Sequence, residues 1–92
     1  MKTYVVSYDP IGPGRKHDAI DALLSSYPKS IQALTSTWFV QTDDTAFKIA
    51  IALEEVLDDD DGMIINTLDT DDVSVWAASL SPEIDTWLQQ NL

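Results

Sequence analysis

The sequence predicts an α+β domain in which two helices cover one face of an antiparallel sheet. Segments of strand-like composition alternate with segments whose apolar residues recur at helical spacing. Clusters of proline, glycine or aspartate punctuate the chain between them. The chain has 92 residues, 45% of them apolar, which suffices for one domain with one core. We therefore assign residues 1–92 to a single domain.

The first half of the chain predicts a strand, a helix and an extended segment. Residues 2–8 are rich in Val and Tyr and predict a strand, and the proline- and glycine-rich residues 10–14 force a loop after it. A helix follows from Lys16 and stops before Pro28. Its apolar stripe consists of Ile20, Leu23, Leu24 and Tyr27. Residues 30–41 form either one long strand with a bulge or an irregular piece followed by a strand.

The second half predicts two helices and a strand. Capping side chains in residues 42–45 precede a helix over residues 45–57. The wide apolar face expected for it comprises Phe47, Ala50, Ile51 and Leu57, with Ile49, Leu53 and Val56 alongside. Residues 63–68 predict a short strand, and residues 69–79 a brief extended edge. Ser81 as N-cap and Pro82 at the first helical position then begin a C-terminal helix.

A strand–helix–strand unit followed by a second such unit is the ferredoxin-like βαββαβ pattern, here with an added C-terminal helix. Two helices then cover one face of the antiparallel sheet. The other face is left open, and in so small a domain we expect a second subunit or an extra helix to cover it.

The negative charge lies in one half of the chain. Residues 1–48 carry five acidic and five basic residues, whereas residues 49–92 carry 11 acidic residues and no Lys or Arg, so the whole net charge of −11 belongs to the second half. A surface of this charge repels the phosphate backbone, which disfavours direct nucleic-acid binding. It suits a basic protein partner, or simply keeps the protein soluble. The candidate partner-binding residues are Asp58, Asp59, Asp60, Asp61, Asp69, Asp71 and Asp72.

Several kinds of site are disfavoured by residue type and spacing. The chain has no cysteine and one histidine, which excludes cysteine chemistry and a multi-histidine metal site within one chain. The run of four aspartates before Gly62 does not fit a calcium loop, because the first and last ligand positions fall on Leu57 and Leu68. His17 has no nucleophile placed with it by the sequence. The three tryptophans are expected in the core or at an interface. With no apolar segment near the roughly 20 residues of a membrane span, we expect a cytoplasmic protein that does not bind membranes.

Asp9 is the one candidate for a metal site. It ends the first predicted strand, where a carboxylate is either a turn residue or a functional group. A lone carboxylate cannot hold a metal ion, but two copies related by a twofold axis could share one Mg²⁺ or Mn²⁺. That ion would activate a water for phosphodiester cleavage.

The segments YVVSYDPIGPGR and STWFV resemble the small CRISPR-associated adaptation subunit, and they resemble the SinR-like bacterial proteins more closely. The C-terminal LSPEIDTWLQQNL is also similar to the end of the SinR-like sequences. The resemblance implies a ferredoxin-like homodimer. It would give Asp9 the role of the metal-binding carboxylate of a nuclease, Arg15 that of the family's loop arginine, and Ser36 that of the serine that begins the later strand motif. This chain differs from the CRISPR subunit in its acidic charge and in Pro10, which stiffens the loop.

These observations predict an acidic, dimeric protein-binding module in a bacterial or phage defence setting. No cofactor is expected for it. One alternative is a metal-dependent endonuclease that uses paired Asp9 with Mg²⁺ or Mn²⁺. Another is an acidic mimic of nucleic acid that inhibits a CRISPR effector or another nucleic-acid-binding protein.

Overall fold

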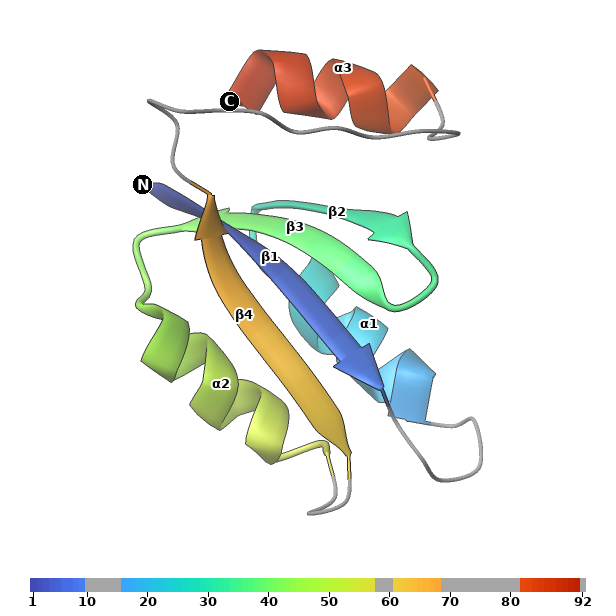
Figure 1. Ribbon diagram of the computed structural model, residues 1–92, viewed down its shortest axis with the longest axis vertical. Helices are drawn as coiled ribbons and strands as arrows, with labels where there is room; N and C mark the ends of the chain where they lie inside the picture. The colour runs from blue at the N-terminus through green and yellow to red at the C-terminus, as the bar shows by residue number, and fades with distance from the viewer. Residues whose placement is uncertain (10–15, 58–60, 69–81, 92) are drawn as a thin grey trace.

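The protein is an α+β structure with a four-stranded, open antiparallel sheet and three helices in the part of the chain that the structure describes (Figure 1). The computed structural model describes residues 1–9, 16–57, 61–68 and 82–91. In chain order the elements are β1 (Lys2–Asp9), α1 (Lys16–Ser25), β2 (Lys29–Leu34), β3 (Thr37–Thr42), α2 (Ala46–Glu54), β4 (Gly62–Leu68) and α3 (Pro82–Asn91).

The first strand of the chain occupies the middle of the sheet. The strand order is β2-β3-β1-β4, and every neighbouring pair is antiparallel. β1 pairs with β3 on one side and with β4 on the other. Since side chains alternate along a strand, Tyr4, Val6 and Tyr8 all point to one face, where each is buried. The alternation of apolar residues in β1 thus defines the core face of the whole sheet.

The extended segment over residues 30–41 is a hairpin of two strands, so both alternatives considered for it are wrong. β2 and β3 are joined by the two residues Thr35 and Ser36, and their register shifts between Gln32 and Leu34. Two-residue hairpin turns usually carry glycine or asparagine. Neither occurs here, so the turn lacks the composition that would have divided the segment.

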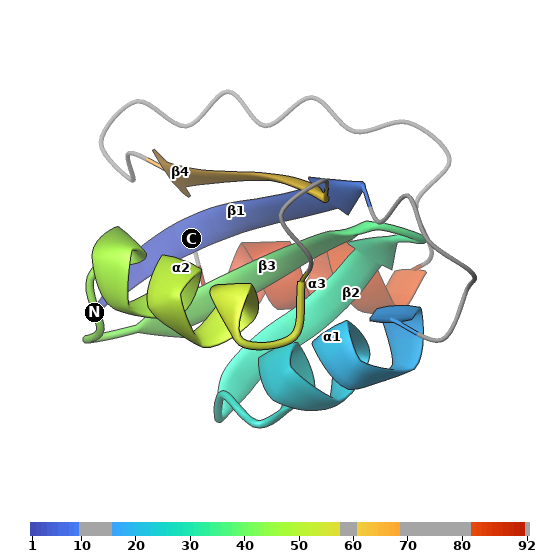
Figure 2. The same ribbon diagram turned by 90° about the horizontal axis from the view of Figure 1, so that it is seen from below.

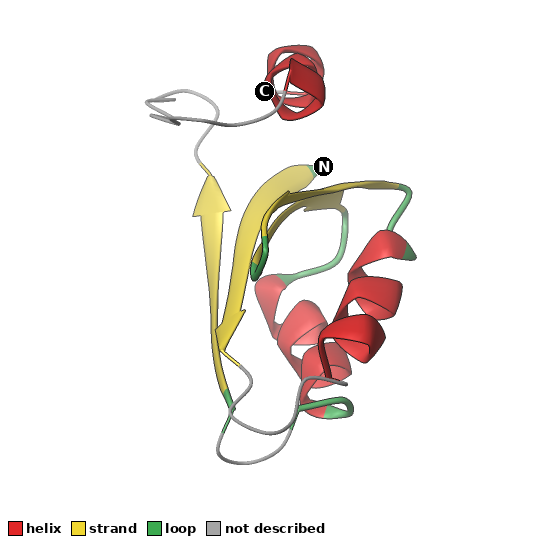
Figure 3. Ribbon diagram, turned by 90° about the vertical axis from the view of Figure 1, so that its right-hand side faces the viewer, coloured by secondary structure: helices red, strands yellow, loops and turns green. Residues whose placement is uncertain are grey.

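Helices α1 and α2 cover the core face of the sheet, as Figures 2 and 3 show. The predicted stripe of α1 is confirmed, because Ile20 and Leu24 are fully buried and Leu23 and Tyr27 pack against the same core. From α2, Ile49 and Leu53 are fully buried. The buried cluster comprises Tyr4, Val6, Tyr8, Ile20, Leu24, Trp38, Val40, Ile49 and Leu53. This core joins β1 and β3 to both helices.

Helix α3 packs on the opposite face, over the β2–β3 side of the sheet (Figure 1). The ring of Trp87 stacks on that of Phe39, with centroids 6.1 Å apart and planes inclined by 20°. Beside them, the Gln41 Nε2 group donates to the Thr3 hydroxyl at 3.1 Å and to the Asn91 carbonyl at 3.0 Å. Trp38 in the core and Trp87 on this face confirm the packing expected of them. Trp76 lies outside the described residues.

The helix ends follow local signals. Thr45 caps α2, because its hydroxyl accepts from the backbone N–H of Lys48 at 3.2 Å, as the capping residues predict. α2 ends at Glu54, earlier than expected. α3 begins at Pro82, but the predicted cap Ser81 and the predicted edge over residues 69–79 lie outside the described part. No described helix is long and apolar enough to cross a membrane.

Replacing Leu24 by alanine should lower the free energy of unfolding by about 2–5 kcal/mol, because it leaves a cavity in a fully buried site. Chemical denaturation of the two proteins measures the difference. Leu34→Ala is the matched control, since Leu34 is 57% exposed and its loss should change stability by less than about 1 kcal/mol. Equal losses for the two variants would contradict the placement of α1 against the sheet.

Candidate functional site

Asp9 ends β1 with an exposed side chain, and it pairs across the sheet with Gly62. By alternation it shares the face of Thr3, Val5 and Ser7, which is the face on which α3 packs. An open pocket of about 260 Å³ lies at this end of the sheet. Its lining residues are Ser7, Tyr8, Asp9, Gly62, Met63 and Ile64. Among the described residues that line this open hollow, Asp9 is the one acidic group.

Within one chain, the described residues hold no group of three or more His, Asp or Glu side chains that could bind a metal ion. Oxygen-ligated cations such as Mg²⁺ take several ligands, some of them water. Asp9 fits such an ion only as one of several ligands. A metal site built at this strand end from the described residues alone would need further ligands, and the sharing of one ion between two copies stays a prediction.

A polar cluster lies directly behind Asp9, on the core side of the same strand. The Tyr8 hydroxyl donates to Asp21 Oδ1 at 2.8 Å and accepts from Trp38 Nε1 at 3.2 Å. Trp38 Nε1 is also 3.2 Å from the same Asp21 oxygen. The three side chains come from β1, α1 and β3, so one shared carboxylate ties the end of β1 to a helix and to the next strand.

The environment of Tyr8 keeps its hydroxyl protonated. Burial, followed by the hydrogen bond to the Asp21 carboxylate, raises the pKa of Tyr8 from 10.0 to about 12. Tyr8 is 4% exposed. It therefore acts as a hydrogen-bond donor at neutral pH and cannot serve there as a base.

His17 and Ser36 meet at the edge of this cluster. The His17 Nε2 atom lies 3.1 Å from the Ser36 hydroxyl, and the His17 ring lies 5.7 Å from that of Tyr8. The expectation that no nucleophile accompanies His17 is wrong, because the hairpin turn brings Ser36 to the start of α1. The contact alone does not make a hydrolase, which also needs a group to orient the imidazole and donors for the oxyanion. The Ser36 carbonyl also accepts from the Tyr8 backbone N–H at 3.1 Å, so this turn is fixed to β1.

The structure brings together only some of the predicted site residues. Asp9 ends β1 and Ser36 directly precedes β3, and because Ser7 pairs with Thr37 both residues lie at the same end of the sheet. Arg15 lies outside the described residues, as do Asp58, Asp59, Asp60, Asp69, Asp71 and Asp72. Among the predicted partner-binding acids, Asp61 alone is described; it is half-buried and directly precedes β4.

No protein-family model matches the chain, and a comparison with curated proteins gives no significant match. The resemblance to the SinR-like proteins therefore stays a prediction, and the site is interpreted from its own geometry.

Sequence reasoning missed the cluster of Tyr8, Asp21 and Trp38, although signals for it were present. Tyr8 follows Tyr4 and Val6 in the alternation of β1, which places it on the inner face. Asp21 lies four residues after His17, so both border the buried stripe of α1. An acid beside a buried tyrosine suggests a hydrogen bond, but only the hairpin brings Trp38 to the same carboxylate.

Replacing Tyr8 by phenylalanine should lower the free energy of unfolding by about 1–3 kcal/mol at neutral pH, because Asp21 loses a donor. The wild type should also lose stability as pH rises from about 10 to about 12, because the raised Tyr8 pKa stabilises the folded state fully only below its unfolded value. Denaturation at a series of pH values measures both effects.

The Tyr8→Phe variant should still lose stability at alkaline pH, but less than the wild type. The reason is that the Tyr27 pKa is also raised, by burial and by the nearby Asp44 carboxylate. Tyr4→Phe is the control at neutral pH. The Tyr4 hydroxyl donates to the Asp44 carbonyl at 3.0 Å, and removing it should cost only about 0.5–1.5 kcal/mol. An unchanged alkaline profile in Tyr8→Phe would contradict the assigned pKa.

Proposed function

We propose that the chain is a ferredoxin-like domain that acts as a small acidic protein-binding module and assembles as a homodimer. The order βαββαβ of the elements supports the fold assignment. β1 and β2 run in the same direction with β3 between them, and β3 and β4 run in the same direction with β1 between them. Two interleaved strand–helix–strand units of this kind support the ferredoxin-like assignment that we propose.

The proposed homodimer is supported mainly by the sheet face opposite α1 and α2, half of which is exposed. Among the described elements, α3 alone packs on this face, on the β2–β3 side. On the β1–β4 side, Ile64 is 61% exposed and its partner across the strands is Ser7. Val5 and Asn66 pair beside them on the same face. Burying this surface against a second copy would remove apolar area from water, which favours association.

The charge of the protein supports this choice of surface. Two copies that each carry a net charge of −11 repel each other, so a contact between them is favourable only where few carboxylates lie. Val5, Ser7, Ile64 and Asn66 are all uncharged, and Asp9 lies at the rim. The acidic remainder of the surface is then available to a basic partner. The resemblance to the SinR-like proteins supports placing this module in a bacterial or phage defence setting.

Replacing Ile64 by aspartate should raise the dissociation constant of the dimer by at least about tenfold, because it places a charge in the centre of the contact. Sedimentation velocity over a range of concentrations measures the constant. Added salt should strengthen the wild-type dimer by screening the repulsion between acidic copies.

Leu34→Asp makes the same change of charge at an exposed leucine of β2, on the far edge of the sheet, and should leave the dimer intact. A wild-type protein that is monomeric at all concentrations, or an equal effect of both variants, would reject the proposal.

A second candidate function, a metal-dependent nuclease, is favoured by the position of Asp9. Asp9 shares the sheet face proposed for the dimer contact and lies at its rim, so a twofold axis that passes near residue 9 would bring the two Asp9 side chains together. Both carboxylates could then hold one Mg²⁺ or Mn²⁺, and the bound ion would supply an activated water. The acidic surface opposes nucleic-acid binding and makes this function the weaker one.

Asp9→Asn should abolish any cleavage of RNA or DNA that depends on Mg²⁺ or Mn²⁺, because the amide removes the shared negative charge. A cleavage assay with each ion, and with chelator, measures this. Asp18→Asn, an exposed acid near the start of α1, is the matched control and should leave cleavage unchanged. Absence of cleavage by the wild type, or full activity of Asp9→Asn, would reject the nuclease.

A third candidate function is inhibition of a CRISPR effector or another nucleic-acid-binding protein by acidic mimicry. It depends mainly on the aspartates between residues 58 and 72. Most of these lie outside the described residues. The hypothesis of acidic mimicry is therefore supported by the acidic composition of residues 49–92 and by no distance or contact among the described residues.

A further inference from the structure

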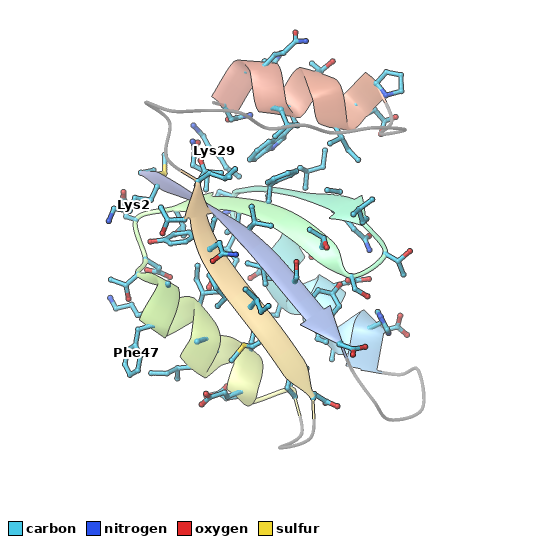
Figure 4. All side chains as sticks on the ribbon, viewed as in Figure 1. Lys2, Lys29 and Phe47 are labelled. Carbon is cyan, nitrogen blue, oxygen red and sulfur yellow. The ribbon has the colours of Figure 1, made fainter. Side chains whose placement is uncertain are left out.

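The outward side of α2 carries two large apolar residues. Phe47 is 72% exposed and Ile51 is 44% exposed, whereas Ile49 and Leu53 of the same helix are fully buried. At 3.6 residues per turn, Ile51 points roughly 160° away from both buried residues. Figure 4 shows the Phe47 ring projecting from α2 away from the sheet. The sequence places Phe47 and Ile51 on the wide apolar face of this helix, but the core takes up only the other side of it.

Phe47 and Ile51 form one continuous apolar surface rather than two separate exposed side chains. They are four residues apart, which makes them neighbours on the surface of a helix. Ala50 and Ala52 between and beside them are small and half-buried, so the larger side chains stand out from the helix. Single exposed apolar residues are common, but this pair makes one apolar strip along the helix, and aromatic residues are enriched at protein interfaces.

Acidic groups lie at one end of this pair. Glu54 is the last residue of α2 and Glu55 is its C-cap, and both are exposed. On the helix, Glu54 lies three residues after Ile51 and Glu55 lies four after it, so both carboxylates border the apolar pair. Phe47, Ile51, Glu54 and Glu55 are called the α2 patch below. Lys48 is the single basic residue of α2.

The position of the two glutamates points to a ligand of positive charge. Carboxylates at the C-terminal end of a helix oppose its dipole and weaken the helix slightly. The last turn of α2 contains no basic residue to offset them. The helix carbonyls and the two carboxylates together concentrate negative potential at one end of an apolar strip, which is where a cation would bind most favourably.

We propose that the α2 patch docks an amphipathic helical segment of a partner protein, with apolar residues to cover Phe47 and Ile51 and Lys or Arg residues to meet Glu54 and Glu55. Helical segments of this kind bind through their own apolar side chains at a spacing of three and four residues. Nucleic acid and an anionic membrane surface are repelled by the same carboxylates. A second copy of this chain is also disfavoured, since two patches in contact would bring four glutamates together.

The inference rests on the proposed role as a protein-binding module but uses a different layer of the structure. α2 lies on the core face of the sheet, and the proposed dimer contact lies on the other face (Figure 3). A dimer joined through β1 and β4 would therefore leave both of its α2 patches free. Each dimer would present two copies of the same docking surface.

The test is a titration of the full-length chain with a synthetic amphipathic peptide whose apolar residues follow helical spacing and whose polar residues are Lys. Two further peptides replace every Lys by Gln or by Glu. Amide chemical shifts of the isotope-labelled chain locate the contact, and calorimetry gives the affinity. The basic peptide should shift amides of α2, its affinity should exceed that of the neutral peptide and fall with salt, and the acidic peptide should not bind.

Phe47→Ala should weaken the basic peptide by about tenfold or more, as expected for an aromatic anchor. Glu54→Gln combined with Glu55→Gln should remove the preference for the basic peptide over the neutral one. Leu34→Ala, which removes an exposed apolar side chain elsewhere, is the control and should change nothing.

Sedimentation of the same variants separates the two proposals. Binding at α2 by a monomeric chain would reject the dimer and keep the docking surface. An intact dimer with no α2 shifts, with shifts elsewhere, or with equal binding of all three peptides would reject the docking surface. Binding of zwitterionic lipid vesicles through the same amides, without preference for the basic peptide, would also reject it.

Discussion

A four-stranded sheet has two faces to cover, and the structure of this protein follows from how its described helices divide them. α1 and α2 cover one face completely enough to bury nine residues in one cluster. On the other face, α3 is anchored to β3 by the stacked rings of Phe39 and Trp87. It leaves Ile64 of β4 in solvent. The surface that we propose for a dimer contact is thus the part of the sheet that α3 does not reach.

The end of β1 belongs to two environments at once. Tyr8 points into the core and is held by Asp21 and Trp38, while Asp9 points to the opposite face and borders the open pocket. Because Tyr8 is hydrogen-bonded to side chains of α1 and β3, the core holds the strand that carries Asp9 from one side. A carboxylate on a strand is better suited to a defined contact than one on a loop.

Local patterns in the sequence predicted most of the elements but not their junctions. The stripe of Ile20 and Leu24, the cap at Thr45 and the start of α3 at Pro82 depend on neighbouring residues only, and all three were predictable. The turn at Thr35 and Ser36 was not, because neither residue requires a turn. With the turn unknown, neither the meeting of Ser36 with His17 nor that of Trp38 with Asp21 could be foreseen.

The helix α2 shows a second limit of pattern analysis. Its apolar residues extend nearly around the helix, so periodicity alone could not decide which side faces the core. The sheet selects Ile49 and Leu53 and leaves Phe47 in solvent.

The central position of β1 also has a consequence for how the chain folds. β1 is the first strand to be synthesised, yet both of its neighbours, β3 and β4, come later in the chain. One edge of this strand can pair with β3 only after residue 42 has emerged, and the other can pair with β4 only after residue 68 has emerged. Pairings between residues so distant in sequence form slowly, and unpaired strand edges are prone to aggregation. The edge of β1 that pairs with β4 therefore stays open longest, and the strong negative charge that arrives with the second half of the chain keeps chains apart as the sheet closes.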